Sequence, residues 1–434
     1  MSVTPTRESR FRVLVFPCGT EIGLEIHRAL CRSAHVEVFG ANSLEPSHGP
    51  LVFKNYLPRL PFVDDPLFLS ALVACLEEHR IDFLYPAHDD VALALARHAG
   101  ELPCVVIGSA RETCEICRSK SATYARLAGI LPVPRLYGTP DPEIPFPVFL
   151  KPDRGEGSRG ARKAHSPEEW EEALKTDPTL LAMEYLPGPE YTVDCFTDRH
   201  GTLRFAGPRE RVRTAGGISM HTRPVKDAQL VEAADRINRA LALRGAWFFQ
   251  MKRDQKGALT LLEIAPRVSG GMGLYRNLGV NLPLLSVYDG AGKNVEIDAL
   301  EYDILLDRAL VSRFQVDIHY DHVYVDLDDT LVTPDGVDPL LAAFLFQCRN
   351  RGKNLHLLTR HAGNAPETLA LNALAGLFDT VTRVTGERRK SAYITLQNAI
   401  FIDDSFSERK EVHRTLGIPV FAPDAVESLL DWRR

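Results

Sequence analysis

The segment Val323-Tyr-Val-Asp-Leu-Asp-Asp-Thr-Leu-Val332 joins an apolar run to two carboxylates, Asp326 and Asp328. Alternate residues of a strand share a face, so a strand that runs into a loop here directs both aspartates toward one pocket. Asp326 is a candidate nucleophile for a phosphoryl group, and Asp328 is a candidate general acid and base. Two close carboxylates repel each other, which favours a divalent cation held by oxygen ligands.

Aspartates at the end of a strand are also common as turn formers or helix caps. Three later segments favour the catalytic interpretation. The apolar run Leu355–Thr359 ends in a hydroxyl that suits a hydrogen bond to a phosphate oxygen. Lys390 follows about 30 residues later and would neutralise a phosphorylated intermediate. A third apolar run, 399–402, leads into Asp403 and Asp404, which suit Mg²⁺.

In order and spacing these segments resemble the haloacid dehalogenase (HAD) superfamily of phosphatases, from about Asp321 to the C-terminus. The resemblance implies a Rossmann-like domain over residues 319–434 that hydrolyses a phosphorylated metabolite through an aspartyl phosphate. The intervals 330–359 and 359–390 leave little room for an inserted cap, so we expect a capless domain. The resemblance implies four catalytic residues, Asp326, Asp328, Thr359 and Lys390. It implies four metal ligands, Asp326, Asp328, Asp403 and Asp404.

Composition restricts the class of protein. The 434 residues suggest about three domains, and an apolar content of 45% with 25% charged residues is typical of a globular protein. The net charge of −6 argues against a general nucleic-acid binder. No bilayer-spanning run and no signal-peptide core are evident, and the eight cysteines are scattered, so we expect a cytoplasmic protein without membrane or nucleic-acid partners. Self-association as a homo-oligomer is left open.

Strands and helices alternate near the N-terminus. Apolar runs predict strands at 11–16, 35–40, 81–85 and 104–107. Helical periodicity predicts helices at 67–78 and 91–99, and one that follows the turn 17–23 and runs through about Cys31. This alternation indicates an open parallel α/β sheet in a small domain over residues 1–112. The turn 17–23 carries two glycines but is not a full dinucleotide-binding fingerprint.

The middle of the chain contains a candidate phosphate site. Lys151 lies on a predicted strand, and the loop that follows contains Gly155, Gly157 and Gly160. Glycines allow backbone N–H groups to wrap a phosphate, and the lysine adds positive charge. The segment 183–194 follows at the distance of one helix and one strand, with backbone groups at 184–186 that suit adenine and with Glu190 for ribose hydroxyls.

A predicted strand pair, 246–253 and 258–265, carries a candidate metal site. Gln250 and Glu263 fall on these neighbouring strands, and their oxygens would bind Mg²⁺ beneath a triphosphate. Arg267 follows the second strand and would meet the transferring γ-phosphate, where charge accumulates.

These segments together resemble the ATP-grasp superfamily of carboxylate–amine ligases, particularly its carbamoyl-phosphate-synthetase-like members, over residues 11–315. The resemblance implies an ATP-grasp α+β domain over residues 113–318 that uses ATP and Mg²⁺, with Mn²⁺ as an alternative ion. It implies small-molecule carboxylate and amine substrates joined through an acyl phosphate. The implied nucleotide-binding residues are Lys120, Lys151, Gly157, Ser158, Glu184, Tyr185, Leu186 and Glu190. Gln250 and Glu263 are implied as metal ligands, and Arg267 as catalytic.

One position departs from the family pattern. The family usually has Glu-x-Asn-Pro-Arg, whereas this chain has Glu263-Ile-Ala265-Pro-Arg267, and an alanine methyl group cannot bind Mg²⁺. Two hypotheses follow. The chain is a bifunctional ligase and phosphatase of small-molecule biosynthesis, or it is a HAD phosphatase regulated by a non-catalytic ATP-binding domain. The complete set of HAD motifs argues against a third hypothesis, an inactive HAD scaffold.

Overall fold

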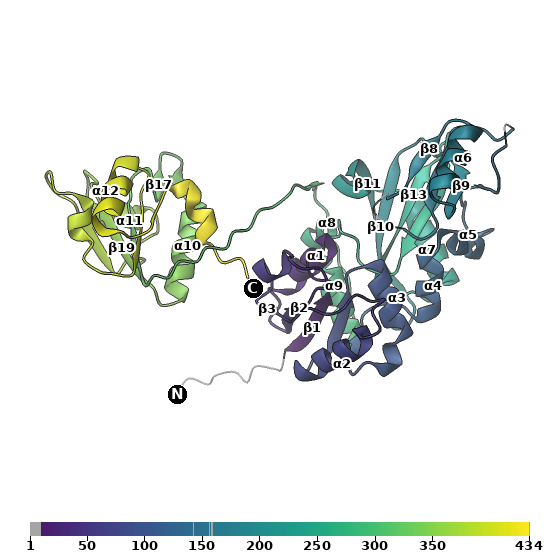
Figure 1. Ribbon diagram of the computed structural model, residues 1–434, viewed down its shortest axis with the longest axis horizontal. Coiled ribbons are helices and arrows are strands. Elements are labelled where there is room, and N and C mark those ends of the chain that lie inside the picture. Colours follow the sequence, from purple (N-terminus) through teal and green to yellow (C-terminus); the bar gives the residue numbers. More distant parts are fainter. Residues whose placement is uncertain (1–9, 142, 156, 158, 434) are drawn as a thin grey trace. The chain divides into compact units, whose positions relative to one another are not determined.

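The computed structural model describes residues 10–141, 143–155, 157 and 159–433. The chain forms two compact units, Met1–Leu310 and Val311–Arg433 (Figure 1). The division falls eight residues before the predicted boundary at 318. Within the described ranges, no helix has the length and hydropathy needed to cross a membrane.

A parallel five-stranded sheet forms the N-terminal part of the first unit, in the order β3-β2-β1-β4-β5. β2 and β3 lie on one side of β1, and β4 and β5 lie on the other. Strands alternate with helices along the chain, as predicted. The carboxyl ends of strands at such a crossover point are a common place for ligands. The elements are β1 Phe11–Phe16, α1 Glu21–Leu30, β2 Val36–Gly40, β3 Asn55–Tyr56, α2 Phe68–Glu78, β4 Phe83–Pro86, α3 Asp89–Arg97, β5 Val105–Val106 and α4 Arg111–Arg118.

The turn between β1 and α1 depends on two residues. The Thr20 hydroxyl accepts a hydrogen bond from the Gly23 N–H at 3.0 Å and caps the helix. A Cβ at position 23 would lie 2.6 Å from the Pro17 and Cys18 carbonyl oxygens, so only glycine allows this close approach. The glycine therefore allows close backbone packing at this turn.

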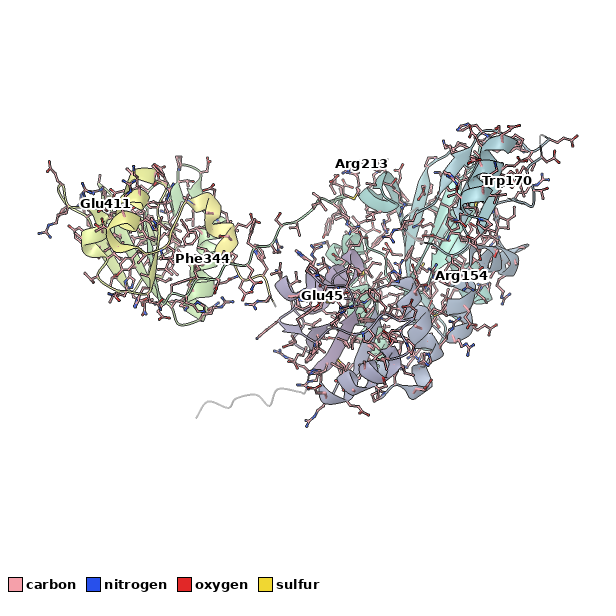
Figure 2. The ribbon with its side chains drawn as sticks, viewed as in Figure 1. Glu45, Arg154, Trp170, Arg213, Phe344 and Glu411 are labelled. Atoms are coloured by element: carbon pink, nitrogen blue, oxygen red, sulfur yellow. The ribbon has the colours of Figure 1, made fainter. Side chains whose placement is uncertain are left out.

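Two antiparallel sheets complete the first unit, with the orders β6-β9-β7-β8 and β14-β13-β10-β11-β12-β15. Trp170 of α6 is 1% exposed in the core of the smaller sheet (Figure 2). The elements are α5 Lys120–Leu127, β6 Leu136–Tyr137, β7 Val148–Pro152, β8 Arg162–Ala164, α6 Pro167–Thr176, β9 Leu180–Glu184, β10 Glu190–Thr197, β11 Leu203–Ala215, β12 Ile218–Pro224, α7 Ala228–Ala240, β13 Gly245–Arg253, β14 Leu259–Ala265, α8 Gly273–Asn277, α9 Leu282–Gly290 and β15 Leu306–Asp307.

One hydrophobic core joins the N-terminal sheet to the largest sheet. Val13 and Tyr85 of the parallel sheet pack in the same cluster as Phe196 of β10, Ala246 of β13 and Val287 of α9. This core crosses the predicted boundary at residues 112 and 113, because α9 contributes apolar side chains to both sheets.

A buried ion pair links β10 to β11. The Arg209 Nε donates to the Asp194 Oδ2 at 2.7 Å, and both side chains are 1% exposed. Arg209 also donates to the Ser269 hydroxyl at 3.0 Å, which in turn donates to Asp194 Oδ1 at 2.5 Å. Removing one partner leaves the other as an uncompensated buried charge.

We expect Asp194→Ala to lower the free energy of unfolding of the first unit by about 3–5 kcal/mol, because Arg209 loses its only buried counter-charge among the described residues. Urea unfolding followed by tryptophan fluorescence measures the change, since Trp170 and Trp247 both lie in this unit. The exposed helical pair Asp235–Arg239 provides the control, and Asp235→Ala should cost below about 1 kcal/mol. A similar small loss for Asp194→Ala would contradict the expectation.

The second unit contains a parallel five-stranded sheet in the order β20-β19-β16-β21-β22. The three strands that precede the acidic and hydroxyl motifs are adjacent, with β16 in the centre, so their carboxyl ends meet at one edge. The elements are β16 His322–Val325, β17 Val332–Thr333, β18 Gly336–Val337, α10 Pro339–Asn350, β19 Asn354–Thr359, α11 Ala365–Leu371, β20 Thr380–Arg383, β21 Ala399–Ile402, α12 Phe406–Leu416 and β22 Val420–Phe421.

Candidate active sites

A cavity between the two antiparallel sheets of the first unit collects the residues predicted to bind nucleotide and metal. Its walls come from α5, β7, the glycine loop, β9, β10, β13 and β14. Ser158 lies outside the described residues. The predicted residues that line the cavity are Lys120, Lys151, Gly157, Glu184, Tyr185, Leu186, Glu190, Gln250 and Glu263.

Lys151 brings a buried cation to this cavity. Its ammonium group donates to the Tyr124 hydroxyl at 3.0 Å and to the Leu262 carbonyl at 3.3 Å, and the residue is 8% exposed. Burial lowers the pKa of Lys151 to about 8, although the nearby Glu263 carboxylate acts in the opposite direction. A lysine with neutral hydrogen-bond partners and little water is well suited to an incoming phosphate anion.

We expect ATP binding to take up a proton above about pH 8, because a bound phosphate raises the pKa of Lys151 from the value near 8 in the free protein. Affinity should be constant well below this pH and should fall as the pH rises through it. Calorimetry with a non-hydrolysable ATP analogue in two buffers of different ionisation enthalpy measures the uptake. Lys151→Met should abolish the uptake, whereas Lys175→Met on the exposed face of α6 should retain it.

Lys120 hydrogen-bonds to the backbone of the glycine loop. Its Nζ donates to the Asp153 and Gly155 carbonyls at 3.3 and 3.2 Å, and the Ser119 hydroxyl donates to the Asp153 carboxylate at 2.8 Å. Burial lowers the pKa of Lys120, while Glu263 opposes the shift. The start of α5 therefore sets the position of the loop that is expected to surround the phosphates.

Glu190, the expected ribose ligand, is held by two cations. The Arg211 Nε lies 2.7 Å from Glu190 Oε1, and the Lys252 Nζ lies 3.5 Å from Oε2. Burial lowers the pKa of Arg211, and the Glu190 carboxylate counteracts that shift. Arg211 and Lys252 both line the nucleotide cavity, and the sequence pattern assigned neither of them to it.

The residues expected to face adenine lie at the end of β9 and directly after it. Glu184 pairs with Val148 of β7, and its N–H donates to the Arg135 carbonyl at 3.0 Å. Burial raises the pKa of the Glu184 carboxyl group. The Lys163 Nζ lies 4.1 Å from the centre of the Tyr185 ring, and Leu186 is 5% exposed. This short segment offers an apolar wall beside the cavity.

Gln250 and Glu263 lie directly opposite each other on β13 and β14. Both line the nucleotide cavity and the cavity next to it, so an amide oxygen and a carboxylate are available to one Mg²⁺. Ala265 lies opposite Phe248 and supplies no oxygen ligand from its side chain. Gln250 and Glu263 would hold one divalent cation, with fewer protein ligands than the family pattern provides.

Arg267 lines the adjoining cavity, which shares Lys120, Gln250 and Glu263 with the first. Its Nε and Nη2 each donate to one Asp89 oxygen at 2.7 Å, and the guanidinium lies 5.2 Å from the centre of the Phe248 ring. Burial favours a raised pKa for Asp89, but Arg267 outweighs it and the pKa is lowered. Asp89 begins α3 of the N-terminal sheet, and nothing in the sequence pattern paired it with Arg267.

In the second unit, three predicted residues form a buried cluster. The Lys390 Nζ lies 2.9 Å from Asp326 Oδ1 and 2.6 Å from Asp403 Oδ2. Burial raises the pKa of both carboxyl groups, to about 6 for Asp403, and the ammonium group opposes the shift. The two carboxylates in turn overcome the effect of burial on Lys390, whose pKa is raised.

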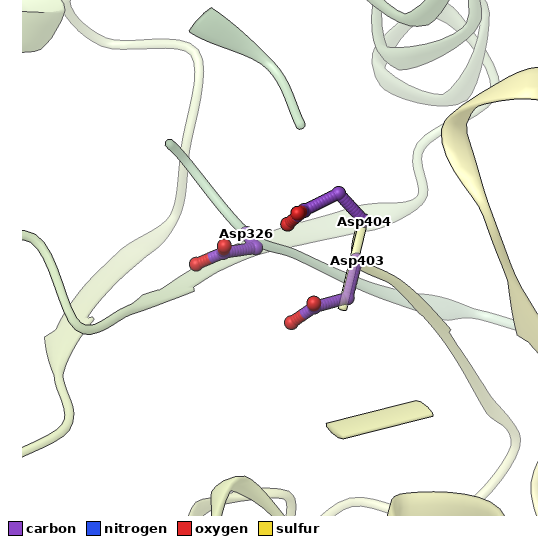
Figure 3. A group of neighbouring side chains, drawn as sticks. All are labelled: Asp326, Asp403 and Asp404. Atoms are coloured by element: carbon purple, nitrogen blue, oxygen red, sulfur yellow. The ribbon is translucent and has the colours of Figure 1, made fainter. Parts of the chain in front are cut away.

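Asp326, Asp403 and Asp404 approach one another at the carboxyl edge of the sheet (Figure 3). One oxygen of each lies within 4.8 Å of the others, the only such group of acidic, histidine or cysteine ligands among the described residues. Three carboxylates with oxygen donors suit Mg²⁺. The predicted fourth ligand differs, because the Asp328 carboxylate is not part of this group and contacts His361 instead.

Hydroxyl groups fix the loops around this cluster. The Thr330 hydroxyl donates to Asp404 Oδ1 at 3.1 Å and accepts from the Asp404 N–H at 2.9 Å. Thr359 is fully buried, is a hydrogen-bond partner of Asp326, and accepts from the His361 N–H at 3.0 Å. The structure thus brings Asp326, Thr359, Lys390 and the two later aspartates together.

Two comparisons support an ATP-grasp assignment for the first unit. A family model described as "ATP-grasp in the biosynthetic pathway with Ter operon" matches residues 176–306. The D-alanine–D-alanine ligase of Alcanivorax borkumensis is 33% identical over 156 residues, which covers 31% of this chain. The chain spans about half the length of this curated relative, 49%.

Solved structures share the fold at low sequence identity. The biotin carboxylase domain of Hydrogenobacter thermophilus 2-oxoglutarate carboxylase, with MgADP, has a TM-score of 0.57 at 19% identity and covers 67% of this chain and 72% of its own. Staphylococcus aureus N5-carboxyaminoimidazole synthetase with ADP gives 0.58 at 14%, with 70% and 84% covered. Bacillus licheniformis L-amino acid ligase gives 0.52 at 18%, with 67% and 76% covered. These matches support the ATP-grasp fold, and the HAD part of the prediction stays a prediction.

Proposed function

We propose that the first unit is an ATP-dependent carboxylate–amine ligase. The observation that carries the proposal is the single cavity in which two buried lysines, Lys120 and Lys151, face Gln250 and Glu263. The adjoining cavity with Arg267 provides room for the acid and amine next to the phosphates. The ATP-grasp family match over residues 176–306, which include Gln250 and Glu263, supports this proposal.

In the proposed reaction a substrate carboxylate oxygen attacks the γ-phosphorus of ATP, the bond to ADP breaks, and an acyl phosphate forms. An amine then attacks the acyl carbon, the bond to phosphate breaks, the amine nitrogen loses a proton to the departing phosphate or to water, and an amide results. Lys120 and Lys151 neutralise the phosphates, and Arg267, held by Asp89, faces the transferring group. Gln250 and Glu263 would hold a Mg²⁺ ion, which supplies further neutralisation of the phosphate charge.

The ligase is tested by measuring ADP release over a panel of amino acids, other amines and carboxylic acids, with the product mass determined. We expect ADP only with a matching acid and amine, together with a product that has lost one water relative to the two substrates. If no pair in a broad panel releases ADP from a protein that binds ATP, the ligase proposal fails.

We further propose that the second unit hydrolyses a phosphate ester. In the first step an Asp326 oxygen attacks phosphorus, the ester bond breaks, and Asp328 gives its proton to the leaving oxygen. In the second step water attacks the phosphoaspartate, Asp328 takes the proton, and the aspartyl bond breaks. The Lys390 Nζ lies 2.9 Å from Asp326 Oδ1. It neutralises the phosphoryl group that Asp326 receives. Asp326, Asp403 and Asp404 would hold Mg²⁺, which adds charge stabilisation.

Ala265 favours a second candidate function, in which the ATP-grasp unit senses ATP and regulates the phosphatase. Calorimetry with a non-hydrolysable ATP analogue, beside the ADP-release panel, separates the two functions. Binding that changes ester hydrolysis, with no ADP formed by any pair, would favour the sensor. An Ala265→Asn variant that gains ADP release would show that the missing ligand limits catalysis.

A further inference from the structure

We propose that His361 is the positioning residue for Asp328, a role that rests on the proposed phosphatase function of the second unit. The sequence analysis did not single out His361. It lies two residues beyond the end of β19, in the loop that leads to α11. Its imidazole connects the candidate acid and base, Asp328, to the first turns of that helix.

The contacts of His361 are specific at both ring nitrogens. Nδ1 lies 2.8 and 3.0 Å from the two Asp328 oxygens, and Nε2 lies 2.9 Å from the Thr368 hydroxyl. A carboxylate can only accept, so Nδ1 must carry the hydrogen when Asp328 is ionised. In the neutral ring Nε2 then accepts from the Thr368 O–H, so the Asp328 carboxylate sets the tautomer and the Thr368 hydroxyl fits it.

The backbone around His361 is held in place independently of the ring. The His361 N–H donates to the buried Thr359 hydroxyl at 3.0 Å. The preceding residue, Arg360, makes two separate contacts. Its Nε donates to Glu408 at 2.9 Å, and its Nη2 donates to the Arg388 carbonyl at 2.8 Å. The imidazole is 19% exposed, whereas the Asp328 side chain is 52% exposed and has few other restraints. Without His361, an exposed aspartate would sample several rotamers.

Gly363 leaves space for this arrangement. A Cβ at position 363 would lie 2.9 Å from His361 Nε2, close enough to force the ring to move. The φ angle of Gly363 lies outside the left-handed region, so an alanine can adopt the backbone conformation at this position. Gly363→Ala therefore displaces the imidazole without removing it.

The chemistry follows from the direction of the Nδ1–H donor. As Asp328 gives its proton to the leaving oxygen, negative charge develops on its carboxylate, and a donor fixed at 2.8 Å stabilises that charge. When water attacks the phosphoaspartate, the same donor holds the carboxylate in the orientation that accepts the proton. His361 acts through Asp328 and does not itself touch the phosphoryl group.

The test compares two phosphate esters that need the acid to different degrees. The alkoxide leaving from an alkyl phosphate is strongly basic and requires protonation, whereas the phenolate leaving from p-nitrophenyl phosphate departs with little help. We expect His361→Leu to lower kcat/KM for an alkyl phosphate about 10²-fold, the lower range for a general acid, and to change the value for the aryl ester less than about 5-fold. Retained aryl-ester hydrolysis also shows that the variant folds.

Conservative and coupled variants sharpen the result. Asn places an amide N–H near the position of Nδ1, so His361→Asn should recover most of the alkyl-ester rate, while Gly363→Ala should show an intermediate loss. Asp328→Ala should show the same leaving-group selectivity, and adding His361→Leu to it should have little further effect because the two residues form one unit. Equal losses on both esters, no loss on either, or additive effects in the double variant would overturn the role of His361.

Failure of the proposed function has a different signature. Wild-type protein that hydrolyses neither ester in Mg²⁺, or Asp326→Asn protein that hydrolyses both at the wild-type rate, would overturn the phosphatase itself and the role of His361 with it. Wild-type hydrolysis that depends on Asp326 but is insensitive to His361 would overturn the positioning role alone.

Discussion

Asp326→Asn is expected to reduce phosphate-ester hydrolysis by at least about 10³-fold, because the variant lacks the anionic oxygen that attacks phosphorus. Asparagine has nearly the same shape as aspartate, and Lys390 keeps its 2.6 Å contact with Asp403, so the cluster should remain folded. Hydrolysis of p-nitrophenyl phosphate in Mg²⁺, measured on the full chain, gives the effect directly.

Asp335→Asn provides the matched control, because Asp335 is exposed beside the β17–β18 hairpin and outside the carboxylate cluster. It should retain the wild-type rate. Full activity in Asp326→Asn would show that another residue is the nucleophile, since no side-chain amide of asparagine can replace a carboxylate in that step.

Lys151→Met is expected to reduce ATP-dependent ADP release by about 10²–10³-fold, the range found when one preorganised charge that stabilises a transition state is removed. Methionine fills a similar volume beside Tyr124 but supplies no charge to the phosphates. Rates of ADP formation with a matching acid and amine, and the affinity of a non-hydrolysable ATP analogue, separate an effect on catalysis from an effect on binding.

Lys175→Met, on the exposed face of α6, is the control for the loss of one lysine charge and should behave as wild type. Lys151→Arg adds information, because it keeps the charge but changes its geometry. If Lys151→Met released ADP at the wild-type rate, the cavity lined by Lys120, Lys151 and Glu263 would not be the site of phosphoryl transfer.

The sequence predicted the elements that carry strong local patterns. The strand ahead of Asp326 and the strand ahead of Asp403 lie within one residue of their expected bounds, since each is a short apolar run that ends at acidic residues. Lys151, Gln250 and Glu263 also line one cavity. Local patterns indicate such neighbours because strand alternation determines which side chains share a face.

The sequence pattern did not predict contacts between segments that lie far apart along the chain. Asp89 and Arg267 are far apart along the chain, and only the packing of α3 near the end of β14 makes them an ion pair. The contact of His361 with Asp328 arises in the same way, from a loop after one strand reaching the loop after its neighbour. A histidine two residues beyond a motif threonine was the one available signal.

Local sequence patterns also did not show which segments share one core. The sequence divides the N-terminal sheet from the ATP-grasp region, yet Val13, Phe196 and Val287 share one core. Periodicity reports which face of an element is apolar but not which partner covers it, so two predicted domains became one compact unit.

The central claim is that one chain carries two separate centres of phosphate chemistry, and it is tested most directly by a paired assay of two variants. ADP release over the acid and amine panel and ester hydrolysis are measured on wild type, Lys151→Met and Asp326→Asn. We predict that Lys151→Met loses ADP release and keeps ester hydrolysis, and that Asp326→Asn shows the reverse. A variant that loses both activities while remaining folded, or an Asp326→Asn protein with undiminished ester hydrolysis, would contradict the claim.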